Sequence, residues 1–185
     1  MTLLYKGRYR TRFRQVCELM RDTEQTVLEL CFGDVAIASY CRRQGKRWLG
    51  LDVNDTFVEN AVRRGFEARK EDISQADVFP ACDLCIMMGS LYHFKAHLPD
   101  LFCRIKTASA RWIISEPVKN WTHASNPWLS LLARKGTRVG ACEETFRFDE
   151  RSLVSVLDEL KISVGFNYRI VSVSRDMIVE VVWLN

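Results

Sequence analysis

The sequence predicts an α/β fold: a doubly wound, mostly parallel seven-stranded sheet with a C-terminal antiparallel hairpin and helices on both faces. Three observations predict it. The chain has 185 residues, 48% of them hydrophobic and 27% charged, which is enough for one globular domain over residues 1–185. Short apolar runs alternate with helical segments as far as residue 160. Two β-rich runs follow, separated by Arg175 and Asp176, as in a hairpin.

The apolar runs give the strands of the predicted sheet. Buried strands are expected at residues 26–31 (TVLELC), 47–53 (RWLGLDV), 83–88 and 112–115, and a more exposed one at 66–70. The hairpin takes residues 162–174 and 177–184. Helices are expected at 34–43, 55–64, 98–107 and 151–160, and another includes residues 130–133. Asn54 or Asp55 can cap the second of these helices, and Gly65 can end it.

Charge is distributed unevenly along the chain. Residues 1–15 contain five cations and no acid, whereas the whole chain carries only +4, so the remainder carries −1. The basic residues therefore belong to a local arm or helix over residues 1–24. In its first part, cations alternate with aromatic residues, a pattern that can bind RNA phosphates and stack on bases. A helix with its arginines in solvent explains the pattern equally well, and the neutral remainder of the chain disfavours nucleic acid as a partner.

The seven cysteines do not indicate a disulfide framework. Their number is odd and most lie in apolar runs, as expected of buried thiols in a reducing cytosol. Cys82 and Cys85 form a CxxC pattern, but they belong to a predicted strand, so no metal site is expected. No apolar segment is long enough to span a membrane or follows the basic N-terminus as a signal peptide does, so a cytoplasmic protein is expected.

A doubly wound sheet binds its ligand at the carboxyl ends of its strands, beside the point where the strand order reverses. The loops expected there contain Gly33, Asp52, the pair Asp72 and Ile73, and Gly89. Gly33 lies between a strand and a helix N-terminus, where backbone N–H groups favour a polar ligand. Asp52 ends the next strand, where a carboxylate can accept hydrogen bonds from both hydroxyls of a ribose. Asp52 as a helix cap and Asp72 as a surface turn residue are the simpler alternatives.

These segments together resemble the class I S-adenosylmethionine-dependent methyltransferases. VLELCFGDVAIA is similar to the first motif of that family, GLDVN to the acidic end of its second strand, and EDI to the acid after its third. DLCIMMGSLYHF is similar to its fourth motif, and IISEPV to its fifth strand. The resemblance covers about residues 25–118, in order and at the usual spacings.

The resemblance implies S-adenosylmethionine as the cofactor and assigns residues to it. Glu29, Cys31 and Gly33 would contact the methionine part, Asp52 the ribose, and Asp72 and Ile73 the adenine, while Met88, Gly89 and Ser90 would lie near the methyl group. Val53 would also bind the cofactor. The family usually has glycines at the positions of Cys31 and Val35. We expect Cys31 to adopt an ordinary negative φ, and Val35 to narrow the site and weaken cofactor binding.

The function expected from the resemblance is methyl transfer to a small-molecule acceptor, with no metal. His93 is the candidate general base, because its ordinary pKa suits removal of a proton from the acceptor. Tyr92, Glu116 and His123 are candidate substrate contacts, and the irregular residues 119–148 are expected to cover the acceptor. The alternatives are a cofactor-binding pseudoenzyme or interaction partner, and an RNA methyltransferase. A nicotinamide dehydrogenase is disfavoured, because the first loop has one glycine and no substrate domain follows.

Overall fold

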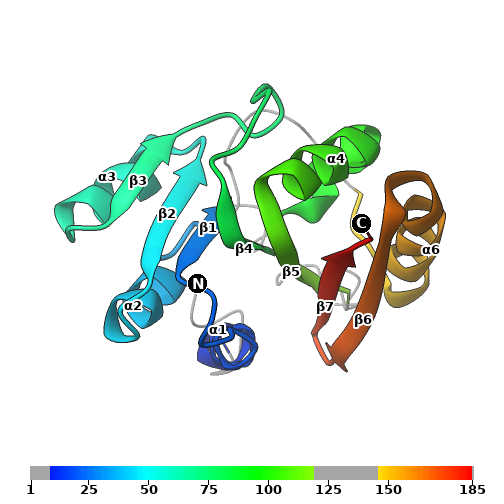
Figure 1. Cartoon of the computed structure of the whole chain (residues 1–185), viewed down its shortest axis with the longest axis horizontal. Coiled ribbons are helices and arrows are strands. Elements are labelled where there is room, and N and C mark those ends of the chain that lie inside the picture. Colours follow the sequence, from blue (N-terminus) through cyan, green and yellow to red (C-terminus); the bar gives the residue numbers. More distant parts are fainter. Residues whose placement is uncertain (1–8, 119–145, 185) are drawn as a thin grey trace, which may run out of the picture.

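The computed structural model describes residues 9–118 and 146–184, and within them seven strands form one sheet in the order β3-β2-β1-β4-β5-β7-β6 (Figure 1). Strands β1 to β5 run parallel, and β7 is antiparallel to both β5 and β6. The predicted fold class is confirmed. The strands are β1 (Thr26–Leu30), β2 (Arg47–Asp52), β3 (Glu67–Lys70), β4 (Cys82–Met88), β5 (Ser109–Pro117), β6 (Phe166–Val173) and β7 (Asp176–Trp183).

Helices cover both faces of the sheet. One core contains buried residues of α1 (Tyr9–Glu18), α2 (Ala36–Arg43) and α3 (Asp55–Arg63). The other contains residues of the 3-10 helix η1 (Leu91–His97), α4 (Leu98–Ala108), α6 (Glu150–Leu160) and the π-helix η3 (Lys161–Gly165). The central strands contribute alternate residues to the two cores, as a sheet covered on both sides requires.

Local signals in the sequence fix several element ends. The Asn54 side chain caps α3 by accepting a hydrogen bond from the Thr56 N–H at 2.9 Å. Gly65 follows that helix with a φ of +74°, which glycine adopts at little cost. Asp149 and Ser152 form a reciprocal capping box at the start of α6.

Two segments differ from the expectation. Residues 162–165 belong to η3 and not to a strand, because the chain continues from α6 and buries Val164 in the core before Gly165 ends the turn at a φ of +80°. Residues 91–97 form η1, which follows Gly89 where only a loop was expected, and this helix buries Leu91 and Phe94. The helix expected at 130–133 lies outside the described residues.

The described cysteines are free, and no group of metal-ligating side chains occurs among the described residues. Burial raises the pKa of the Cys17 and Cys82 thiols to about 12, so both remain protonated and pack as small apolar groups. No described helix has the length and apolar character that a membrane span needs.

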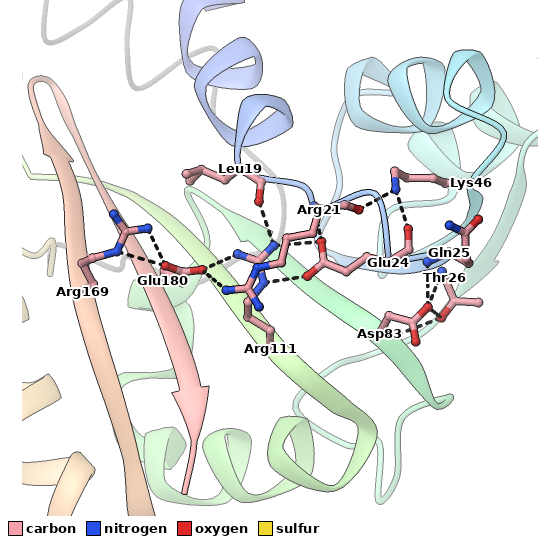
Figure 2. A network of polar contacts seen from close by, with 10 residues as sticks. All are labelled: Leu19, Arg21, Glu24, Gln25, Thr26, Lys46, Asp83, Arg111, Arg169 and Glu180. Carbon is pink, nitrogen blue, oxygen red and sulfur yellow. Dashed lines mark hydrogen bonds and ion pairs between the residues drawn. The ribbon is translucent and has the colours of Figure 1, made fainter.

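A buried ion-pair network holds the linker between α1 and β1 at the amino ends of the strands (Figure 2). Arg111 of β5 is 3% exposed and binds both carboxylate oxygens of Glu24, at 2.7 and 2.8 Å. It also donates to Glu180 of β7 at 2.6 Å and to the Leu19 carbonyl at 2.8 Å. The network therefore joins the end of α1 to two strands, and we call Arg111, Glu24 and Glu180 the amino-edge clamp.

Candidate functional site

The candidate site lies at the carboxyl ends of β1, β2 and β4. In the strand order, β1 is the strand from which the chain continues outward in both directions, to β2 on one side and to β4 on the other. A ligand site is expected outside the strand ends at this point. The first loop begins at Cys31, directly after β1, and the Cys31 N–H donates a hydrogen bond to the Leu51 carbonyl of β2 at 2.7 Å.

Asp52 joins the first two loops of the site. Its carboxylate accepts hydrogen bonds from the Gly33 N–H at 3.2 Å and the Asn54 N–H at 2.9 Å. Asp52 is only 6% exposed, and burial raises its pKa while the backbone hydrogen bonds act in the opposite direction. The cap of α3 is Asn54, so capping that helix does not account for Asp52.

Cys31 has a φ of +54°, which contradicts the expected negative value. Among the described residues other than glycine it alone has a positive φ, and Gly33 two residues on also has +54°. The chain turns here to bring the Gly33 N–H to Asp52, and the cost of a Cβ in this conformation is about 1–2 kcal/mol. Cys31 is partly buried, and burial raises its thiol pKa further than the Ser90 hydroxyl lowers it, with Asp52 and Asp72 also raising it.

Val35 does not line the site. Its side chain is 2% exposed and lies in the core with α1 and α2, where it precedes the first residue of α2. The expected narrowing of the site by Val35 is therefore wrong, because the branched side chain points toward the apolar core.

Gly89, assigned to the region of the methyl group, directly follows β4 at the same edge of the sheet. Its φ is +70°, and its N–H donates to the Ser115 carbonyl at 2.7 Å. Met88 before it is buried, whereas Ser90 after it is partly exposed. A Cβ placed on Gly89 would lie 3.2 Å from a terminal nitrogen of Arg12. The structure thus brings an arginine of α1 into the site, which the sequence suggested only as one cation of a basic arm.

Glu29 is fully buried beneath the first loop. Its Oε2 accepts a hydrogen bond from the Trp48 indole at 2.8 Å, and its Oε1 has no hydrogen-bond partner among the described residues. Burial raises the pKa of Glu29 well above its ordinary value, against the opposing effects of Trp48 and Arg12. Burial therefore favours the neutral form of the Glu29 carboxyl.

Three further residues assigned to the cofactor, Val53, Asp72 and Ile73, differ in exposure. Ile73 is 2% exposed and belongs to the core, whereas Val53 is 51% exposed. Asp72 is exposed, and its carboxylate accepts hydrogen bonds from the N–H and the hydroxyl of Ser74 at 2.9 and 2.6 Å. Asp72 therefore stabilises a surface turn, which is the simpler of the two roles expected for it.

Glu116 of β5 lies beside Gly89 and η1. Its Oε2 accepts a hydrogen bond from the Leu91 N–H at 3.0 Å, and its Oε1 is buried with no hydrogen-bond partner among the described residues. Burial raises the pKa of Glu116 to about 8, with Asp176 raising it further and Arg12 and Arg147 lowering it. This carboxyl can hold or release a proton near neutral pH.

η1 carries the other expected substrate residues. His93 is exposed, and its ring lies 3.9 Å from the half-buried ring of Tyr92. The Arg147 guanidinium lies over the Tyr92 ring at 3.5 Å, so residues 146–148 return to the site after the segment outside the described residues. His123 belongs to that segment, and its assignment stays a prediction.

Two surface hollows in the described part of the chain lie away from this edge. One is at the amino-edge clamp; the other is lined by basic residues of α2 and by Arg64 and Phe66. Neither includes a predicted site residue, so we place the site by its loops and by the topology of the sheet.

No family model matches the sequence, and no curated protein matches it in sequence. Several solved structures match the fold. Magnesium protoporphyrin IX methyltransferase (ChlM) from Synechocystis PCC 6803, with bound SAH, is 15% identical at a TM-score of 0.66, covering 95% of this chain and 84% of that chain. Human N-acetylserotonin methyltransferase in complex with SAM is 16% identical at a TM-score of 0.67, covering 96% of this chain and 53% of that one.

A third similar structure is a putative S-adenosylmethionine-dependent methyltransferase from Listeria monocytogenes. It is 14% identical, has a TM-score of 0.66, and is covered to 98% of its length by 94% of this chain. The similarity thus extends over nearly the whole of both chains. The chain has the fold of the class I S-adenosylmethionine-dependent methyltransferases.

Proposed function

We propose that the protein transfers a methyl group from S-adenosylmethionine to a small-molecule acceptor. The observation that carries the proposal is Asp52, which holds the first two loops together at the end of β2. The cofactor supplies an activated methyl group, so the protein has to bind it, align the acceptor and accept a proton where the acceptor loses one. The similar solved structures that hold SAM or SAH support the choice of cofactor.

The described residues fit this cofactor. Asp52 ends β2, where the ribose would lie, and its carboxylate oxygens can accept hydrogen bonds from the ribose hydroxyls in addition to those from the Gly33 and Asn54 N–H groups. Gly33 and Gly89 have positive φ values and no Cβ, which allows close approach of a ligand to the backbone. Glu29 presents a buried oxygen without a partner among the described residues, as expected where a polar ligand group completes the site.

We assign the acceptor side to η1 and the end of β5. Tyr92 and Arg147 offer a stacked aromatic and cationic surface there, and Glu116 presents the buried Oε1. His93 stays the candidate base, and Glu116 is a second candidate because its Oε1 is buried beside η1. With a pKa of about 8, Glu116 is mostly protonated at neutral pH and can accept a proton only in its minor, ionised form.

Calorimetric titration of S-adenosylhomocysteine into the wild type and Asp52→Ala tests the proposal. The variant should bind about 10- to 100-fold more weakly, since it loses charge-assisted hydrogen bonds. Asp55→Ala is the matched control, because Asp55 lies three residues further on and forms only an exposed ion pair with Lys70. Unchanged binding in a folded Asp52→Ala protein would remove the basis of the cofactor assignment.

Cys31 favours a second candidate function, a cofactor-binding protein without transferase activity. Its Cβ occupies a turn that glycine adopts with less strain, at the point where the methionine part is expected. Mass-spectrometric detection of S-adenosylhomocysteine, formed from S-adenosylmethionine with a panel of hydroxyl and amine acceptors, separates the two functions. Tight binding with no acceptor-dependent product indicates the second.

The alternative of an RNA methyltransferase depends on the cations of the N-terminal arm, and two of these cations take part in ion pairs within the fold. Arg12 is one of the five cations of the arm, yet its side chain is only 11% exposed and pairs with Asp176. Arg14 is exposed but pairs with Glu18 four residues on. Both arginines have roles within the fold, and neither requires a nucleic acid.

A further inference from the structure

A basic hollow lies at the amino ends of β2 and β3, at the edge of the sheet opposite the candidate site. The ends of α2 and α3 meet there, because each of these helices leads into the next parallel strand (Figure 1). The hollow has a volume of about 460 Å³, which is within the range of sites for small ligands. Its lining supplies three guanidiniums and no carboxylate, and consists of Ser39, Arg42, Arg43, Arg64 and Phe66.

Arg42 is held in place across the two helix ends. Its guanidinium lies over the Phe66 ring, 3.7 Å from the centroid, and its Nη2 donates to the Arg64 carbonyl at 3.0 Å. Phe66 in turn packs edge-on against the buried ring of Trp48, with the ring centroids 5.9 Å apart. Arg42 is therefore preorganised, and it loses less conformational freedom on binding a ligand than an unsupported side chain does.

The guanidiniums of this hollow keep most of their donors for a ligand. One of the five N–H donors of Arg42 bonds to a described residue. Arg43 and Arg64 are exposed, and each guanidinium lies 5.9 Å from the centroid of an aromatic ring. Within the described part of the chain, none of the three pairs with a carboxylate, whereas the exposed Arg69 and Lys70 each pair with an acid.

The helix dipole explains only part of this arrangement. Cations in the last turn of a helix interact favourably with its C-terminal end, which gives Arg42 and Arg43 a role in α2. Arg63 has the same role in α3 and does not line the hollow. The dipole does not require three guanidiniums on one concave surface, where their mutual repulsion is unfavourable until an anion binds.

We propose that this hollow binds the phosphate groups of a small molecule that carries a diphosphate. Phosphate oxygens accept parallel hydrogen bonds from the planar fork of arginine. Two linked phosphates offer more charge and more acceptor oxygens than one, which suits a lining with three guanidiniums. Because the hollow lies at the edge opposite Asp52 and Gly89, the inference does not depend on the proposed function.

Inorganic pyrophosphate is the probe, because a nucleotide can also enter the proposed cofactor site through its adenosine. It is titrated calorimetrically at low salt into wild type, Arg43→Gln and Arg64→Gln, which both keep Arg42 and the Arg64 carbonyl. The matched control is Arg63→Gln, since Arg63 is the exposed neighbour of Arg64 and lies outside the hollow. Each lining variant should bind pyrophosphate about 10- to 100-fold more weakly, and the control should change by less than about twofold. Inorganic phosphate should bind the wild type about 10-fold more weakly than pyrophosphate does.

Four outcomes would overturn this proposal. One is wild-type protein that does not bind pyrophosphate at millimolar concentration. Equal weakening in Arg63→Gln shows a general effect of surface charge, and equal affinity for phosphate and pyrophosphate shows that a diphosphate is not selected. A single-stranded RNA oligonucleotide tests the other source of phosphates. If it binds more tightly than pyrophosphate and loses affinity equally in all three variants, the surface is one for nucleic acid. Circular dichroism of each variant confirms that it is folded.

Discussion

Cys31 is an exception to the rule that residues other than glycine adopt a negative φ. A residue with a Cβ is expected at negative φ, yet the first loop imposes +54° on Cys31 because the turn has to bring Gly33 to Asp52. The requirement comes from Asp52 at the end of β2, which follows Gly33 by 19 residues in the sequence. This contact between Gly33 and Asp52 forms only in the tertiary structure. The local sequence around Cys31 therefore could not predict its positive φ.

Cys31→Gly is expected to be tolerated, since glycine takes this φ without a steric penalty. The comparison is Cys103→Gly, because Cys103 is exposed on α4 and glycine inside a helix costs about 0.5–1 kcal/mol. Relief of the left-handed conformation gains about 1–2 kcal/mol. The two effects act in the same direction, but Cys31→Gly also loses the packing of its thiol, which reduces the difference. Urea denaturation should therefore find Cys31→Gly more stable than Cys103→Gly by about 1–2 kcal/mol. The reverse order would show that Cys31 is not strained.

Glu116 makes the stability of the fold depend on pH. Its pKa rises from 4.5 to about 8 on folding, so between these values the folded protein keeps a proton that the unfolded chain has released. Stability relative to Glu116→Gln should therefore fall as the pH rises from 4.5 to 8, by at most about 1.4 kcal/mol per pH unit. The groups acting on this carboxyl are the Leu91 N–H, Arg12, Asp176 and Arg147. Denaturation at pH 5.5, 6.5 and 7.5 checks this, and parallel curves for the two proteins would contradict it.

Helix α1 shows how elements place a residue that motifs do not reveal. Its C-terminal end is tied to β5 and β7 by the amino-edge clamp (Figure 2), while its first turns lie over Gly89. The sequence predicts a basic helix here, but it does not say which face meets the sheet. Burial of Phe13 and Val16 decides that, and it turns Arg12 inward and Arg14 outward.

Removal of Arg111 from the amino-edge clamp should strongly lower the free energy of unfolding. Arg111→Met leaves Glu24 and Glu180 without their buried cation, and loss of one member of a buried pair destabilises by about 3–5 kcal/mol. Arg169→Met removes a partner of the same Glu180, but Arg169 is 65% exposed, so its loss should cost under about 1 kcal/mol. Guanidinium denaturation of the two variants measures the difference. Equal, small losses would mean that the clamp does not hold the linker.

At the scale of the whole molecule, the sequence predicts the sheet and its order of elements, and from these the edge at which we place the site. The alternation of apolar runs and helices suffices for this, because it reflects burial on both faces of a parallel sheet. The sequence misses features that depend on distant partners: the φ of Cys31, the inward turn of Arg12, the burial of Val35, and the helical continuation at 161–165. That Asp52 and Gly89 lie at the same edge was predictable, because Asp52 ends β2, Gly89 follows β4, and the carboxyl ends of parallel strands meet at one edge.

Backbone NMR during titration with S-adenosylhomocysteine tests the central claim most directly, since it shows where the ligand binds without assuming any residue's role. The account predicts shifts in the amide signals of Gly33, Asn54, Gly89 and Leu91 at the carboxyl edge. It predicts none at Gln25 and Thr26, whose amides are bound by Asp83 near the opposite edge. Shifts confined to the amino edge, or no shifts at millimolar ligand, would contradict the claim that this edge binds the cofactor.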